Sequence, residues 1–232
     1  MGILSDLTDS VEEILATQWA TRDGRKVPEP EDVKLGNDAV KLDGTVLYAD
    51  LADSTGLVRG KSAAFAAEVY KCYLHCASKI IEHYDGVITA FDGDRVMAVY
   101  VGDGKNTKAV RSALAINHAV LKIVNPRIEA QYPGNCYVVR QSVGIDSSSL
   151  FVAKTGIRGS NDLVWVGMAA NIAAKLCGLR SGNYASWITK TVYDHMNDEV
   201  KMNGDKNMWE QRTWPAQRNM TIYRSLFSWA AS

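Results

Sequence analysis

The chain of 232 residues carries 26 basic and 26 acidic side chains, and 47% of its residues are hydrophobic. This composition is typical of a globular protein with one sizeable core, and the balanced charge gives no overall field that would attract nucleic acid or a membrane surface. The sequence contains neither an apolar stretch long enough to cross a bilayer nor a basic, apolar leader. We therefore expect a cytoplasmic protein that binds neither nucleic acid nor membranes.

The N-terminal region separates from the rest of the chain by composition. Residues 5–19 predict an amphipathic helix, because Leu7, Val11 and Ile14 share one face at helical spacing. The next stretch is polar, includes two prolines and predicts a linker. We expect a helical extension and linker over residues 1–40 and one main domain over residues 41–232.

The main domain shows strand-like and helix-like patterns in turn, which predicts an α/β or α+β fold. A hairpin is expected over residues 86–101, with its turn at Asp92-Gly93-Asp94. Strands are expected at residues 45–50, 136–145, 149–153, 163–166 and within 218–229, and helices at residues 62–84, 105–124 and 168–179.

Two carboxylates stand at the ends of predicted strands. Asp50 ends the first strand of the main domain, Asp94 lies in the hairpin turn, and the long helix between them allows the two strands to lie side by side. Oxygen ligands of this kind suit Mg²⁺ or Mn²⁺. The turn after Asp50, "LADSTG", leads into a helix and offers backbone N–H groups to phosphates. Taken singly, Asp53 and Ser54 are better explained as ordinary turn residues, and Asp94 as an ordinary hairpin residue.

Four segments occur together in a characteristic order: "VLYADLADST", "GVITAFDGDRVMAVY", "SVGID" and "VWVGMAANIAAKL". In order and approximate spacing they resemble the catalytic domain of class III nucleotidyl cyclases, the adenylate and guanylate cyclase family. The resemblance implies a ferredoxin-like domain with an antiparallel sheet flanked by helices. It also implies a head-to-tail homodimer with active sites at the interface, and two divalent ions, Mg²⁺ or Mn²⁺, in each site.

The same resemblance assigns roles to individual residues. Its metal ligands are Asp50, Leu51 and Asp94, its phosphate-binding residues are Asp53, Ser54, Thr55 and Arg158, and its catalytic pair is Asn171 and Lys175. The catalytic pair is one helical turn apart, so both side chains face the same way. Without the aspartates, a capped helix with a solvated lysine would be the better explanation of this pair. Lysine replaces the arginine of the family, which keeps the charge and loses bidentate phosphate contact.

The base-binding positions depart from those of purine cyclases. Ala90 and Val164 stand where adenylate cyclases carry a lysine and an aspartate or threonine. By strand alternation Tyr48 shares the face of Asp50, and Ala90 and Asp92 share the face of Asp94. A phenol beside the metals shortens the pocket and favours a one-ring base, and Asp92 can accept the N3–H of uracil. We expect Trp165 to stack on the base. Tyr48 as a core aromatic, and Asp92 as a turn acid or third metal ligand, are alternatives.

This combination resembles the pyrimidine cyclases of bacterial antiphage defence (Pycsar), which are stand-alone cyclase domains. It implies conversion of UTP to cyclic UMP, which a separate cyclic-nucleotide effector would detect. A cytidylate cyclase, a purine cyclase with its own base recognition, and an inactive nucleotide-binding module are the alternatives.

Overall fold

The computed structural model describes residues 2–231. Its principal strands are β1 (Ala20–Asp23), β2 (Asp38–Leu51), β3 (Val87–Asp92), β4 (Arg95–Val101), β5 (Gln141–Ile157), β6 (Ser160–Val166), β7 (Ser186–Thr189), β10 (Glu210–Trp214) and β11 (Met220–Ser225), with a small separate pair, β8 (Met202–Asn203) and β9 (Lys206–Asn207). Its α-helices are α1 (Ile3–Ala16), α2 (Ser54–Gly60), α3 (Ala63–His83), α4 (Lys105–Ala119), α5 (Asn125–Gln131), α6 (Met168–Cys177) and α7 (Lys190–His195).

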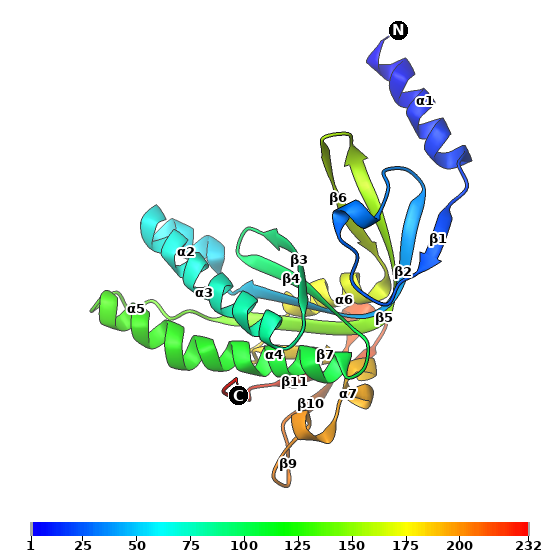
Figure 1. Cartoon of the computed structure of the whole chain (residues 1–232). Coiled ribbons are helices and arrows are strands. Elements are labelled where there is room, and N and C mark those ends of the chain that lie inside the picture. Colours follow the sequence, from blue (N-terminus) through cyan, green and yellow to red (C-terminus); the bar gives the residue numbers. More distant parts are fainter. Residues whose placement is uncertain (1, 232) are drawn as a thin grey trace.

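Within residues 2–231, nine strands form one mixed sheet in an α+β fold (Figure 1). The order along the sheet is β10-β11-β7-β5-β2-β4-β3, with β1 paired to β2 and β6 paired to β5. Helices α3 and α4 pack on one face, and α6 packs on the other. The expected antiparallel pairing holds for most of the sheet, and two pairs are parallel. The β5–β7 pair is parallel because the chain returns through β6 and α6, and β1 pairs parallel with β2.

The central helix and hairpin agree with the sequence-based expectation. Helix α3 begins after Ser62, whose side-chain oxygen accepts a hydrogen bond from the Phe65 backbone N–H at 3.3 Å. The β3–β4 hairpin turns at Gly93, which has a φ of +61°. Strand β2 pairs with both β4 and β5 and so lies at the centre of the sheet.

Strand β5 differs from the two short strands expected at residues 136–145 and 149–153. It is continuous from Gln141 to Ile157, and residues 136–140 lie outside it. The polar run in its middle looks like a turn, but its side chains find partners in the fold. Asp146 accepts a hydrogen bond from the Thr189 hydroxyl at 2.6 Å, and the Ser147 hydroxyl donates to the Gly44 carbonyl at 3.3 Å. Tertiary hydrogen bonds therefore keep the strand unbroken.

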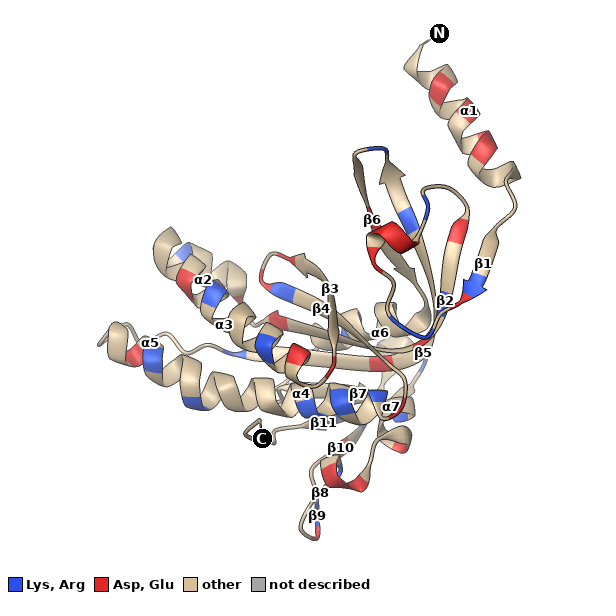
Figure 2. Ribbon diagram, viewed as in Figure 1, with Lys and Arg blue, Asp and Glu red and all other residues tan. Residues whose placement is uncertain are grey.

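Residues 20–40 are more ordered than a linker. Strand β1 lies in this segment, and Val27 and Val33 are buried in the apolar cluster beneath α6. Helix α1 projects from the body in Figure 1, and Figure 2 shows acidic but no basic residues on it. Its apolar side chains, including Leu7 and Val11, are exposed. No helix within residues 2–231 is both long and apolar enough to span a membrane.

The second half of the chain contains elements that we did not expect. The helix expected over residues 105–124 continues beyond residue 124. A π-helical turn (Val120–Val124) links α4 to α5, where Pro126 occupies the first turn. Strand β7 and helix α7 were missed. All four side chains of β7 are buried, so its sequence lacks the alternation that marks a half-buried strand.

Helix α6 lies very close to the sheet because of one glycine. A Cβ atom on Gly144 in β5 would come within 2.2 Å of the Ala173 carbonyl oxygen and 2.4 Å of the Cys177 nitrogen. Only glycine therefore allows this approach. The outer face of α6 then presents Asn171 and Lys175 to solvent.

Candidate active site

Two carboxylates meet at one edge of the sheet. Asp50 lies near the end of β2, opposite Arg95 in β4, and Asp94 immediately precedes Arg95 in the hairpin turn. Burial raises the pKa of Asp50, and the negative charge of Asp94 raises it further, while Arg180 and Arg95 lower it. The structure thus brings together the two predicted metal-binding aspartates.

The oxygens at this edge fit a divalent cation. Oδ2 of Asp94 is buried and has no hydrogen-bond partner, although a buried carboxylate oxygen normally has one. Leu51 adds a backbone carbonyl oxygen beside Asp50, since Arg180 contacts both. No group of three or more His, Cys, Asp or Glu side chains suited to a metal occurs among residues 2–231. Mg²⁺ commonly uses one or two carboxylates together with substrate phosphates, and this donor set suits that arrangement.

Arg180 is a residue of this site that the sequence did not reveal. Its Nη2 donates to Oδ2 of Asp50 at 2.7 Å and to the Leu51 carbonyl oxygen at 2.8 Å. Arg180 lies in the loop after α6, far from Asp50 in sequence, and no motif or spacing connects the two. Only the packing of α6 on the sheet brings them into contact.

The predicted phosphate-binding turn is held in a fixed conformation. Asp53 has a left-handed backbone, with a φ of +59°, and caps α2 by accepting a hydrogen bond from the Gly56 N–H at 3.2 Å. A Cβ atom at position 56 would lie 2.4 Å from the Asp53 carboxylate, so this cap requires glycine. Ser54 and Thr55 form the first turn of α2. The turn therefore directly follows the end of β2 that carries Asp50.

The predicted base-binding residues of β2 and β3 share one face with Asp50. Tyr48 and Ala90 both pair with Met97, and Asp50 and Asp92 both pair with Arg95. A β-bulge at Thr89 maintains this alignment in β3. The expectation that Tyr48 shares the face of Asp50 is confirmed, and Ala90 and Asp92 lie on this face too. That Ala90 and Asp92 face Asp94 stays a prediction.

Arg95 is a second residue that the sequence analysis missed. Its guanidinium pairs with the Asp92 carboxylate at 2.7 Å and lies 5.4 Å from the centre of the Tyr48 ring. Burial raises the pKa of Tyr48, and Arg95 partly offsets this. The face beside Asp50 therefore combines a phenol, a carboxylate and a guanidinium. A sequence signal existed, because Arg95 directly follows Asp94 and faces the same way as Asp50.

Within one chain Val164 and Trp165 lie far along the sheet from Asp50, although Trp165 packs against the same apolar cluster as Tyr48. They are neighbours in β6, so their side chains point to opposite sides, and only one of them can line a given pocket. Trp165 pairs with Val152, whereas Tyr48 pairs with Gly144 in the same strand β5. Gly144 and Val152 are eight residues apart along β5, which is about 26 Å at the usual rise of a strand.

Within residues 2–231, the predicted cationic and catalytic residues make no hydrogen bond or ion pair with Asp50 or Asp94 of their own chain. Asn171 and Lys175 are exposed on α6. Arg158 is exposed in the β5–β6 turn, beyond the last residue of β5, whereas Asp50 pairs with Ser142 near the first. Among residues 2–231, neither Lys175 nor Arg158 has an ion pair. One chain therefore holds two separate halves of the predicted site.

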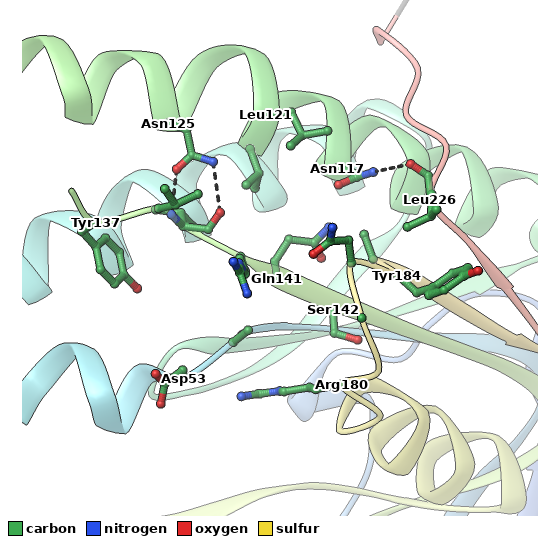
Figure 3. A pocket seen from close by; sticks show the side chains of 18 of the residues that line it. Asp53, Asn117, Leu121, Asn125, Tyr137, Gln141, Ser142, Arg180, Tyr184 and Leu226 are labelled. Carbon is green, nitrogen blue, oxygen red and sulfur yellow. Dashed lines mark hydrogen bonds between the residues drawn. The ribbon is translucent and has the colours of Figure 1, made fainter.

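A cavity of about 920 Å³ adjoins the metal-binding edge (Figure 3). Asp53 and Arg180 line it at one end, and Gln141 and Tyr184 line it further along β5 and the loop after α6. The amide of Gln141 is buried without a hydrogen-bond partner. The turn that follows β2 and the side chain of Arg180 therefore line the same cavity.

Comparison with known proteins identifies the family. A uridylate cyclase of Xanthomonas perforans is 49% identical over 99% of this chain and 99% of its own length. A uridylate cyclase of Burkholderia cepacia is 44% identical, also over 99% of both chains. No family model matches the chain.

Solved structures show the same fold. The adenylyl cyclase CyaB from P. aeruginosa superposes with a TM-score of 0.70 at 22% identity, over 82% of this chain and 97% of that chain. The guanylyl cyclase Cya2 gives 0.68 at 18% identity, over 82% and 94%. The expected class III cyclase fold is confirmed, and the chain belongs to the uridylate cyclase family of nucleotidyl cyclases.

Proposed function

We propose that this chain converts UTP to 3′,5′-cyclic UMP and pyrophosphate. The buried, unpartnered oxygen of Asp94 beside Asp50 carries the proposal, because it marks a cation site next to a phosphate-binding turn. Relatives that match over almost their full length are named uridylate cyclases, which supports UTP as the substrate. In the reaction the ribose 3′-hydroxyl attacks the α-phosphorus, and the bond to pyrophosphate breaks.

The residues of the acid edge act mainly by positioning the substrate. Asp50, Leu51 and Asp94 would hold two divalent ions, Mg²⁺ or Mn²⁺. When bound, such ions acidify the attacking hydroxyl and neutralise charge on the triphosphate. The turn of Asp53, Ser54 and Thr55 orients the phosphates beside them.

We propose that two chains associate head to tail and share each site. Asn171 and Lys175 of a second copy would face the acid edge of the first, and its Arg158 would meet the pyrophosphate. This accounts for their exposure and for their separation from the acids of their own chain. Asn171 then orients the ribose, and Lys175 balances the charge that develops on the phosphates.

The face beside Asp50 supports a pyrimidine. Tyr48 fills space that a second ring would need. Asp92 is an acceptor for the N3–H of uracil, and the neighbouring Arg95 is a donor for an exocyclic oxygen. Cytosine lacks the N3–H and would leave the Asp92 carboxylate unmatched, which disfavours CTP. Val164 or Trp165 of the second copy would complete the pocket.

The biological setting is a further part of the proposal. The resemblance to pyrimidine cyclases of antiphage defence supports a cytoplasmic enzyme whose product acts as a second messenger. A separate effector protein would bind the cyclic UMP.

The test is a four-nucleotide assay. The purified chain is incubated separately with UTP, CTP, ATP and GTP in the presence of Mn²⁺, and the products are identified by mass spectrometry. We expect cyclic UMP as the main product, and no product from Asp94→Asn with UTP. Cyclic AMP or cyclic GMP as the only product would overturn the proposed substrate, and turnover by Asp94→Asn would overturn the metal assignment.

A further inference from the structure

Arg180 and a divalent cation need the same oxygens. One guanidinium nitrogen donates to Oδ2 of Asp50 at 2.7 Å and to the Leu51 carbonyl oxygen at 2.8 Å. Both oxygens belong to the donor set proposed for the metal, whose remaining member, Oδ2 of Asp94, has no partner. A cation held by these oxygens would lie next to the guanidinium, and two positive charges at such close range repel each other. Metal binding must therefore compete with Arg180.

The surroundings of Arg180 allow it to move. Its side chain is 39% exposed and stands on a loop outside the core. It lines the cavity of about 920 Å³ at the same end as Asp53, which belongs to the predicted phosphate-binding turn (Figure 3). The guanidinium can leave Asp50 without disturbing core packing, and the space beside it leads to the phosphates.

Electrostatic attraction favours movement of the Arg180 guanidinium from Asp50 toward the triphosphate. A cation bound to Asp50 neutralises the partner that holds Arg180, while the accompanying triphosphate brings several negative charges to the adjacent turn. A guanidinium presents paired donors that match phosphate oxygens better than an ammonium does. The family position for this group is Lys175 in this chain, so Arg180 is the guanidinium already at the metal-binding edge.

We propose that Arg180 is a further functional residue of the reaction, exchanging its contact with Asp50 and Leu51 for the triphosphate when the metal–nucleotide complex binds. The contact of Arg180 with the triphosphate rests on the proposed function. The competition of Arg180 with the metal for Asp50 and Leu51 does not depend on which nucleotide is the substrate. Arg180 thus lowers the affinity for free metal and contributes to the affinity for the reacting phosphates.

Metal binding tests the first contact without catalysis. Mn²⁺ is titrated into the protein without nucleotide, and free Mn²⁺ is followed by electron paramagnetic resonance. We expect Arg180→Met to bind Mn²⁺ about tenfold more tightly than the unsubstituted chain, and Arg180→Lys to lie between them. Circular dichroism checks that each variant is folded.

Two matched substitutions separate competition from general charge effects. Arg111→Met removes a distant arginine of similar exposure, 40%, that pairs with Glu199, and it should leave Mn²⁺ affinity unchanged. Arg95→Met removes a nearby charge that lowers the pKa of Asp50 without a hydrogen bond to it, and it should change Mn²⁺ affinity by less than threefold. Equal effects of Arg95→Met and Arg180→Met would overturn the competition, as would unchanged affinity in Arg180→Met.

Kinetics test the second contact. With saturating Mn²⁺, and with whichever nucleotide the unsubstituted chain cyclises, Arg180→Met should lower kcat about 30-fold, and Arg180→Lys should recover part of the loss. Tighter Mn²⁺ binding with unchanged kcat would overturn the proposal. Failure of UTP to react would instead overturn the proposed substrate, and the two Arg180 experiments would still decide the role of Arg180.

Discussion

The acid half and the cationic half of the candidate site are built in opposite ways. Asp50 is largely buried, and Arg180, from the same chain, holds it in place. Asn171 and Lys175 stand exposed on α6. The acid half is preorganised within one chain, whereas the cationic half has no acidic partner there.

This contrast shows which half depends on assembly. Carboxylates placed close together repel each other, so a fold that holds them needs local compensation, which Arg180 and Arg95 supply. Exposed cations are solvated and need none. A second chain can therefore complete the site without refolding either half.

Mixing two inactive variants tests this division most strongly. Asp94→Asn damages only the acid half and Asn171→Ala only the cationic half, so each alone should lose about 1,000-fold in kcat, roughly 4 kcal/mol of transition-state stabilisation. Co-expressed and co-purified with two different tags, they should form heterodimers in which one of the two sites is intact, with about half the kcat of the unsubstituted dimer. The measurement is the rate of cyclic UMP formation.

The control is Asp94→Asn combined with Asn171→Ala in one chain, co-expressed with the unsubstituted chain. A heterodimer of that kind would retain one intact site only if each site took its acids and its Asn171 from the same chain. If each site combines the acids of one chain with the Asn171 of the other, no site is intact. In this control each site contains one substitution, so activity should remain low. High activity in the control and none in the first mixture would show that each site lies within one chain.

The sequence predicted the acid half well because its signals are local. A strand ending in Asp50, a glycine turn before Asp94 and a capped helix at Ser62 each follow from neighbouring residues. The alternation along β2 and β3 also placed Tyr48 correctly on the face of Asp50.

Residues connected through tertiary contacts could not be predicted. Arg180 meets Asp50 only because Gly144 lets α6 approach the sheet. The polar centre of β5 resembles a turn in the sequence, but Asp146 and Ser147 form hydrogen bonds with Thr189 and Gly44 that keep the strand continuous. In both cases the deciding partner is far away in sequence.

The type of cation at position 175 should affect kcat less than the loss of Asp94 or Asn171 does. Lys175→Met should lower kcat about 100-fold, because a positive charge facing the phosphates is lost. Lys175→Arg should stay within about tenfold, because charge is kept while the donor geometry changes. Lys79→Met, which removes an exposed lysine paired with Glu82 on α3, is the control and should change kcat less than twofold. Equal rates for Lys175→Met and the unsubstituted chain would remove Lys175 from the reaction.

The smallest expected effect concerns stability, and we expect it only in the acid half. Burial and Asp94 raise the pKa of Asp50, so the ionised Asp50 disfavours the folded state at neutral pH, and this cost disappears as Asp50 is protonated at low pH. With metal removed by EDTA, Asp94→Asn should therefore raise the free energy of unfolding by roughly 1 kcal/mol at pH 7.5, and by less at pH 4. Lys175→Met should change it by less than about 0.5 kcal/mol at either pH, because Lys175 is exposed. Urea denaturation measures both. A loss of stability in Asp94→Asn at pH 7.5 would mean that Arg180 and Arg95 more than offset the repulsion between the two acids in the metal-free chain.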